Sequence, residues 1–126
     1  MRVLLLEDDQ QLSFLWREVF DDLGLECVAV TNISDAMGHV LRGNFDLYVL
    51  DLFLEDGNSL SLSDWIATRA PDVPILMLTG SQVMPNGEHV DLAAGVTWML
   101  RKPISTADFR AYVEHLLASP RARIRA

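Results

Sequence analysis

Five short apolar runs, separated by longer segments with helical periodicity, most constrain how this chain can fold. The runs lie at 2–6, 25–30, 45–50, 74–78 and 96–100. Most are apolar at nearly every position, which is typical of strands buried on both faces of a parallel sheet. The alternation of such strands with helices predicts an α/β fold built on an open, doubly wound, five-stranded parallel sheet.

Amphipathic helices are predicted between these runs, because apolar residues recur there every three or four positions. The second helix is expected to begin with Ser34 as its N-cap, and the third to span 60–69. A short helix is expected near 88–94, and Ser105 or Thr106 is expected to cap the last one. The predicted inward residues are Leu12, Leu15, Trp16, Val19, Phe20, Leu23, Met37, Val40, Leu41, Leu62, Trp65, Ile66, Val90, Ala93, Ala94, Phe109, Tyr112, Val113, Leu116 and Leu117.

The composition fits one globular domain, since 50% of the 126 residues are apolar and 22% are charged. We expect this domain to occupy 1–118, followed by a basic tail at 119–126. No apolar run approaches the roughly 20 residues of a membrane span, and 1–9 turns acidic too soon for a signal peptide. The single Cys27 cannot form an internal disulfide and is interpreted as a core residue, which fits a reducing, cytoplasmic compartment.

The charge of the chain restricts its partners. The net charge of −8 would repel nucleic acid, so we expect protein partners and cations instead. His39, His89 and His115 are scattered along the chain and are not paired with cysteine, so we predict that they bind no metal.

Chemically reactive side chains follow four of the five runs. Glu7 and Asp8 follow the first run, Asp51 the third, Thr79 the fourth and Lys102 the fifth. The carboxyl ends of parallel strands lie at one edge of a sheet, and ligands of such sheets bind there where the chain order reverses. With the strand order 2-1-3-4-5, strands 1 and 3 are neighbours, so Glu7 and Asp8 should lie beside Asp51.

The loop after the first run favours a cation over a nucleotide. A nucleotide-binding loop would carry glycines there, whereas this chain has three successive acids, Glu7, Asp8 and Asp9. Taken alone, these acids could equally be solvated, or favoured by the dipole of the following helix. Asp51 supports the cation reading, because an unpaired acid at the end of an apolar strand is costly unless it shares a cation with Asp8.

Together these groups suit magnesium and phosphate. An oxygen-only ligand set with retained waters is what Mg²⁺ prefers, and a carboxylate can act as a nucleophile toward phosphorus. One Mg²⁺ and Lys102 would balance the charges of Glu7, Asp8 and Asp51. Thr79 offers a hydroxyl donor, and the adjacent Gly80 leaves the approach to it open.

With these residues in view, the chain resembles the receiver domain of two-component response regulators over 1–118. The matching segments are VLLLEDDQQL, YVLDLFLEDGNSL, PILMLTG and GVTWMLRKP. The resemblance implies a flavodoxin-like three-layer sandwich. It also implies that Asp51 accepts a phosphoryl group, that Asp8 binds Mg²⁺ directly and Glu7 through water, and that the backbone carbonyl of Phe53 is a third protein ligand.

The resemblance extends to the remaining site residues and to the partners. Thr79 would donate a hydrogen bond to a phosphoryl oxygen, Lys102 would pair with it, and the bond from Lys102 to Pro103 would be cis. The phosphoryl donor would be a phosphohistidine on a sensor histidine kinase or a histidine phosphotransfer protein. The domain would catalyse its own phosphorylation and slow hydrolysis, yet act as a switch for a downstream protein or for a homodimer formed through its last helices and strand. It would bind neither nucleic acid nor membrane itself.

Several positions depart from the family pattern. Glu55 stands where the family often has proline, Ser59 where it often has glycine, and Met99 where it often has an aromatic residue that couples to the threonine. Trp98 should point to the opposite face of the strand from Met99. The bulky Phe53 could obstruct attacking water, which would slow loss of the phosphate, or it could equally pack on the first helix.

Three alternatives remain open at this point. The chain could be a receiver from a longer DNA-binding regulator or hybrid kinase, or a degenerate receiver that only binds a partner. A flavin-binding protein with the same sheet order is disfavoured by the acidic first loop.

Overall fold

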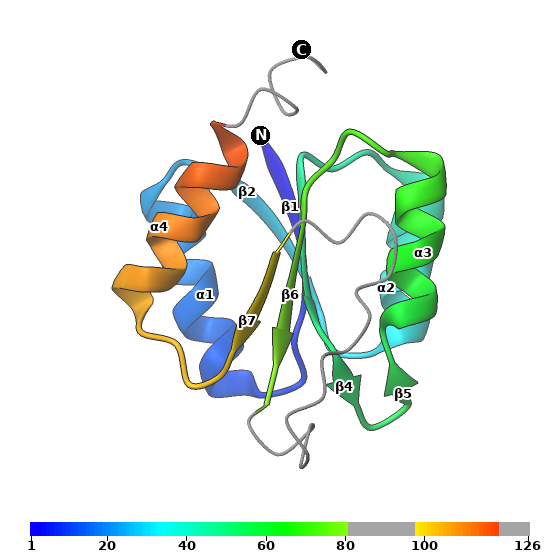
Figure 1. Cartoon of the computed structure of the whole chain (residues 1–126), viewed down its shortest axis with the longest axis horizontal. Coiled ribbons are helices and arrows are strands. Elements are labelled where there is room, and N and C mark those ends of the chain that lie inside the picture. Colours follow the sequence, from blue (N-terminus) through cyan, green and yellow to red (C-terminus); the bar gives the residue numbers. More distant parts are fainter. Residues whose placement is uncertain (81–97, 119–126) are drawn as a thin grey trace.

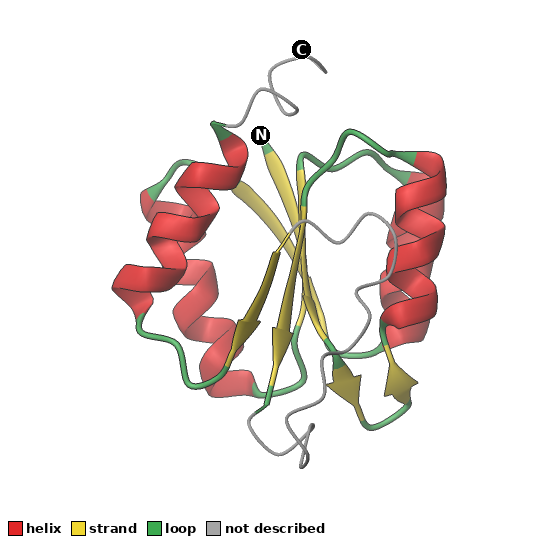
Figure 2. Ribbon diagram, in the orientation of Figure 1, coloured by secondary structure: helices red, strands yellow, loops and turns green. Residues whose placement is uncertain are grey.

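The computed structural model describes residues 1–80 and 98–118, and within them five parallel strands form one sheet. These strands are β1 Arg2–Leu6, β2 Glu26–Val30, β3 Leu47–Asp51, β6 Ile75–Thr79 and β7 Trp98–Arg101. Their spatial order is β2-β1-β3-β6-β7, which is the predicted order 2-1-3-4-5. Figure 2 shows these strands in yellow between two layers of helices in red. The predicted helix near 88–94 and the tail at 119–126 lie outside the described residues.

Helices cover both faces of the sheet, which confirms the three-layer sandwich (Figure 1). The helices α1 Gln10–Asp22 and α4 Thr106–Leu117 lie on one face, and α2 Ile33–Arg42 and α3 Leu60–Arg69 on the other. Alternate strand residues enter two separate cores, so that Leu5 packs toward α1 while Leu4 packs toward α2 and α3. None of the helices in the described part is long and apolar enough to cross a membrane.

Side-chain caps explain where three of the helices begin. The Asp9 carboxylate accepts from the N–H groups of Gln11 and Leu12 at the start of α1, and Ser105 caps α4. The cap of α2 is Asn32, so the prediction of Ser34 was wrong. The helix begins at Ile33, which places Ser34 inside its first turn, where it cannot serve as a cap.

Three residues predicted to point inward are exposed. Leu15 is 39% exposed, Leu41 is 50% exposed and Trp65 is 44% exposed. Each directly adjoins a buried residue in the sequence and therefore lies about 100° away from it around the helix axis. The sheet covers only the narrow stripe of the helix that holds the buried residue. The predicted stripes were therefore too wide.

A small hairpin after β3 was not predicted. It consists of β4 Phe53–Leu54 paired antiparallel with β5 Gly57–Asn58. Gly57 has φ +136°, a conformation that other residues rarely adopt. The Asp56 carboxylate in its turn accepts from the Ile33 N–H at 3.1 Å, which ties the hairpin to the start of α2.

Candidate functional site

The predicted site residues lie at the carboxyl ends of adjacent strands, which all point to one end of the molecule (Figure 1). Glu7 and Asp8 follow β1, and Asp51 is the last residue of the neighbouring β3. Thr79 ends β6 and Lys102 follows β7, the next two strands along the sheet. The parallel register therefore gathers five residues that are up to 95 positions apart in the sequence.

Three carboxylates form the centre of this site. Oxygens of Glu7, Asp8 and Asp51 all lie within 4.8 Å of one another. Glu7 is fully buried and Asp51 is 5% exposed, whereas Asp8 is the most accessible of the three. In residues 1–80 and 98–118, this is the one group of three or more His, Cys, Asp or Glu residues with the spacing of a metal site.

Lys102 is the cation that faces these carboxylates. Its Nζ lies 2.8 Å from Oε1 of Glu7 and 3.3 Å from Oδ2 of Asp51. Burial alone would lower the pKa of Lys102, but the hydrogen bond and charge of Glu7, together with Asp51, more than offset this and raise it above its ordinary value. The bond from Lys102 to Pro103 is cis, as the resemblance implied, and the Lys102 N–H donates to the Thr79 carbonyl at 2.7 Å.

Among the described residues, the charges in this cluster are not balanced by protein groups alone. Burial, followed by the negative charge of Glu7, raises the pKa of Asp51 to about 7, although Lys102 acts in the opposite direction. One ammonium group therefore faces three carboxyl groups in a largely buried place. Such a set gains from additional positive charge.

The carboxylates fit a magnesium ion. Mg²⁺ binds oxygen at 2.0–2.1 Å, so two of its ligand atoms are at most about 4.2 Å apart. The limit of 4.8 Å between the carboxylate oxygens therefore requires only small side-chain movements. Asp8 and Asp51 are therefore close enough to share one ion, as the predicted site requires.

The three successive acids Glu7, Asp8 and Asp9 have different roles: two belong to the carboxylate cluster and one caps a helix. Glu7 uses Oε1 for Lys102 and accepts the Asp9 N–H with Oε2 at 3.2 Å. Asp9 caps α1, so its carboxylate belongs to the helix and not to the cluster. The directly available carboxylates are consequently those of Asp8 and Asp51.

Thr79 ends the strand beside that of Asp51, but within the described residues its side chain makes no bond to the carboxylate cluster. Thr79 is 3% exposed, and within the described residues its hydroxyl makes only a long 3.4 Å contact with the Gly80 carbonyl. The Phe53 side chain is 48% exposed and stands two residues beyond Asp51. The predicted roles of the Thr79 hydroxyl and the Phe53 carbonyl remain predictions.

Ser59 is a residue that sequence reasoning missed. It is fully buried, and its hydroxyl donates to the backbone carbonyl of Asp51 at 2.7 Å. A serine just before an amphipathic helix normally indicates an N-cap, so the sequence pattern indicates a role in the helix and not a contact with Asp51. Its contact with Asp51 becomes visible only in the folded chain.

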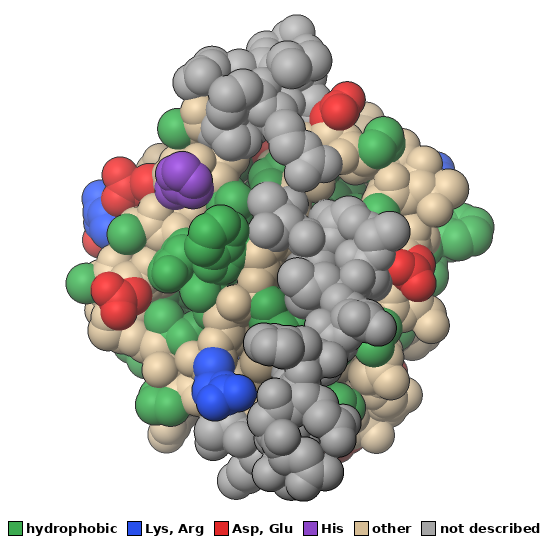
Figure 3. Space-filling view, in the orientation of Figure 1, with side chains coloured by type: hydrophobic (Ala, Val, Ile, Leu, Met, Phe, Trp, Pro, Cys, Tyr) green, Lys and Arg blue, Asp and Glu red, His purple; other side chains and the backbone are tan. Residues whose placement is uncertain are grey.

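Trp98 and Met99 lie on opposite faces of β7, as predicted. Met99 packs against the core beneath α2 and α3, while Trp98 is 43% exposed and lies 5.6 Å from the Tyr112 ring of α4. Figure 3 shows hydrophobic side chains gathered on this side of the molecule, over β7 and α4. An aromatic surface therefore adjoins the strand that leads to Lys102.

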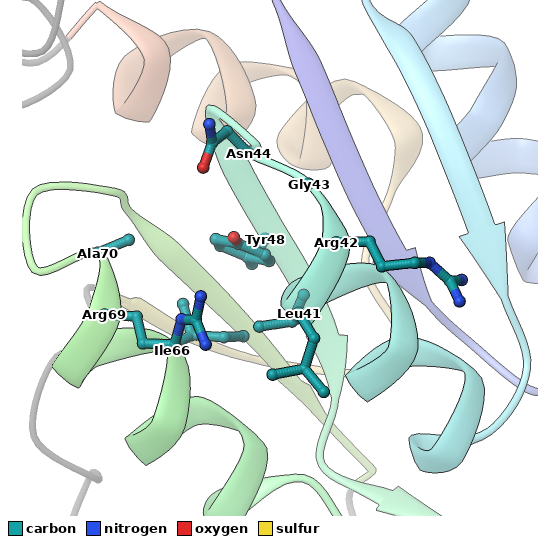
Figure 4. Close-up of a pocket in the computed structure, with 9 residues that line it drawn as sticks. Leu41, Arg42, Gly43, Asn44, Tyr48, Ile66, Arg69 and Ala70 are labelled. Atoms are coloured by element: carbon teal, nitrogen blue, oxygen red, sulfur yellow. The ribbon is translucent and has the colours of Figure 1, made fainter.

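A separate cavity of about 190 Å³ lies at the opposite end of the sheet (Figure 4). Tyr48, near the start of β3, and Ile66 and Arg69, near the end of α3, line it. Asp51 ends the same strand at the other edge, so this cavity is not part of the carboxylate site.

The family model of the response regulator receiver domain matches residues 3–114. The swarming motility regulation protein RssB of Serratia marcescens is 32% identical over 115 residues, which cover 90% of this chain and 52% of RssB. The response regulator protein PilR of Pseudomonas aeruginosa is 27% identical over 112 residues, which cover 89% of this chain and 25% of PilR. The chain thus spans about half or less of these relatives.

Solved structures share the fold. The signal receiver domain of a Vibrio parahaemolyticus protein is 28% identical with a TM-score of 0.81, covering 98% of this chain and 93% of that domain. The response regulator protein TrrA of Thermotoga maritima, solved in complex with Mg(2+)-BeF, is 23% identical with a TM-score of 0.77. The match covers 92% of this chain and 98% of the TrrA chain.

Proposed function

Because this chain belongs to the response regulator receiver domains of two-component systems, we propose that Asp51 accepts a phosphoryl group from a phosphohistidine. Receiver domains of response regulators take phosphate from histidine kinases, directly or through a histidine phosphotransfer protein. The observation that carries the proposal is the buried cluster of Glu7, Asp8 and Asp51 with Lys102 bonded to two of its members.

Two of the proposed metal ligands belong to this cluster, and the third, the Phe53 carbonyl, is taken from the family resemblance. The carboxylates of Asp8 and Asp51 and the backbone carbonyl of Phe53 would hold Mg²⁺ directly, and Glu7 would act through water, since both its oxygens already have partners. A bound Mg²⁺ would supply positive charge that reduces repulsion between the acids and an incoming phosphoryl group.

Asp51 is suited to be the nucleophile. A carboxylate oxygen of Asp51 attacks phosphorus, the bond from phosphorus to the histidine nitrogen breaks, and an acyl phosphate is left on Asp51. Lys102, which favours the ionised form of Asp51, promotes this step because only the ionised carboxylate attacks. Asp8 is the most accessible of the three carboxylates, so the donor would approach the cluster from its side.

The phosphorylated state would be read through Thr79 and Lys102. Lys102 would transfer its 3.3 Å contact from the Asp51 carboxylate to a phosphoryl oxygen, and the Thr79 hydroxyl would donate to another. Rearrangement of these residues at the ends of β6 and β7 would alter the nearby surface of Trp98 and Tyr112. We propose that a protein partner, or a second copy of the chain, binds there in the cytoplasm.

The test is phosphorylation of the protein by acetyl phosphate in the presence of Mg²⁺, followed by intact mass measurement. One added phosphoryl group is expected on the native chain and none on Asp51→Asn. A native chain that gains no phosphate would favour the degenerate receiver, which binds partners without phosphorylation.

A further inference from the structure

A buried serine joins three elements beside the phosphorylation site. The Ser59 hydroxyl donates to the Asp51 carbonyl at 2.7 Å and lies 3.3 Å from Sδ of Met77 on β6. Its backbone N–H donates to the Leu52 carbonyl at 2.9 Å, and it immediately precedes α3. Ser59 is fully buried, so no water replaces these contacts.

The Ser59 hydroxyl does not cap the helix that the residue precedes. In α1, α2 and α4, the residue before the helix accepts a hydrogen bond from the first turn with its side chain. The Ser59 side chain makes no such bond. At the start of α3 it is Oδ1 of Asn58 that accepts the Leu60 N–H, at 3.1 Å. The hydroxyl is directed at Asp51 instead, which indicates a role at the end of β3.

The bond acts on a single peptide unit. The carbonyl of Asp51 and the N–H of Leu52 belong to the same planar group. Ser59 holds the carbonyl at 2.7 Å, and the Leu78 carbonyl accepts the N–H at 2.7 Å from the other side. Both polar groups of this plane are therefore fixed, by two different elements. The plane determines how the chain leaves Asp51 toward Phe53.

We propose that Ser59 is a positioning residue for phosphoryl transfer: its hydroxyl fixes the peptide plane after Asp51 and thereby holds the acceptor carboxylate beside Asp8 and Lys102. This inference rests on the proposed function. It concerns this chain in particular, because glycine, which receivers often have at this place, has no hydroxyl to donate.

A matched pair of variants separates positioning from ordinary stability. Ser59→Ala removes the hydroxyl from Asp51, and Ser63→Ala removes an equally buried hydroxyl that donates to the Leu60 carbonyl at 2.7 Å within α3. Both variants lose one serine-to-carbonyl bond of the same length, so both should be less stable. Ser59→Cys keeps most of the volume with a weaker donor and serves where Ser59→Ala does not fold.

Two readouts test the proposal. Amide hydrogen exchange at Leu52, corrected for global stability, should be about tenfold faster in Ser59→Ala than in Ser63→Ala. The maximal rate of phosphorylation by acetyl phosphate at saturating Mg²⁺ should fall about tenfold in Ser59→Ala and less than about twofold in Ser63→Ala. Ser59→Cys should lie between the native chain and Ser59→Ala in both readouts.

Equal effects of the two alanine variants in both readouts would overturn the inference. If the native chain takes no phosphate at all, the proposed function fails. The exchange rate at Leu52 then still decides whether Ser59 holds the peptide plane.

Discussion

Asp46 directly precedes β3 and Asp51 ends it, so the same strand has a carboxyl group at each end. Asp46 and Arg2 bind each other reciprocally: the Asp46 carboxylate accepts the Arg2 N–H at 2.8 Å, and the Asp46 N–H donates to the Arg2 carbonyl at 2.8 Å. Asp51 is buried beside two further acids, and its pKa is raised to about 7.

The two aspartates differ in the groups of the adjacent strand β1 that lie beside them. At the start of the sheet, β1 presents a backbone N–H that satisfies Asp46 and aligns two strands. At the carboxyl end, the same neighbour presents Glu7 and Asp8, which are charges of the same sign. An acid satisfied by backbone is structural, whereas a buried acid among like charges is a candidate for function.

Replacing each of the two aspartates by asparagine in turn should give the largest difference in phosphorylation. Asp51→Asn should abolish phosphorylation, because the amide is not a nucleophile toward phosphorus. Asp46→Asn should cost about 1 kcal/mol of folding free energy through the weaker hydrogen bond, and should leave phosphorylation intact. Intact mass after acetyl phosphate treatment and urea denaturation measure the two quantities. Phosphorylation of Asp51→Asn at another residue would break the comparison.

Replacing Lys102, the cation that faces the carboxylates, should have the next largest effect on phosphorylation. Lys102→Met leaves Glu7 and Asp51 without their ammonium partner, so we expect a loss of about 1–2 kcal/mol in EDTA, discounted for the partial exposure of Lys102. The phosphorylation rate should fall by about 100-fold, since a charge aimed at the phosphoryl group is lost. Arg101→Met removes the adjacent exposed cation and is the control. Equal rates in the two variants would show that Lys102 has no special role.

The raised pKa of Asp51 predicts how stability depends on pH when metal is chelated. The folded-state pKa of about 7 lies above the ordinary 3.8, so the folded protein binds this proton more tightly than the unfolded chain. The stabilisation is fully present below 3.8 and is lost as pH rises through about 7. We expect a loss of roughly 2 kcal/mol between about pH 5 and pH 8 in EDTA, and a smaller loss with Mg²⁺.

Asp51→Asn is the control for this pH dependence, because it cannot titrate at this position. Its urea-denaturation free energy should change less over the same range than that of the native chain. Parallel curves for the two proteins would mean that other groups cause the dependence.

Much of this site could be predicted from sequence because it depends on topology. Once the apolar runs are parallel strands in the order 2-1-3-4-5, the residues that follow β1 and β3 must be neighbours, and this placed Glu7 and Asp8 beside Asp51. No side-chain detail was needed, since strand ends in a parallel sheet coincide.

The features that were missed depend on individual contacts in the folded chain. The hairpin that follows β3 is held by Asp56, which bonds to Ile33, 23 positions earlier in the sequence. Ser59 has the position of a helix cap but bonds to Asp51 instead. Helical periodicity cannot tell that Trp65 lies outside the stripe that the sheet covers. Each outcome is decided by geometry between distant residues, to which local pattern is insensitive.

The smallest predicted effect concerns access of water to the Asp51 end of β3. Phe53 projects a half-exposed ring from the hairpin that follows Asp51, whereas the neighbouring Leu54 packs into the core. If the ring obstructs attacking water, Phe53→Asn should shorten the half-life of the phosphorylated protein severalfold, about 1 kcal/mol in the barrier. Phe53→Leu, which keeps an apolar side chain, is the control and should change the half-life less. The half-life is measured by mass after the donor is removed; an unchanged value in Phe53→Asn would show that the carboxylate cluster, and not the ring, sets the rate of hydrolysis.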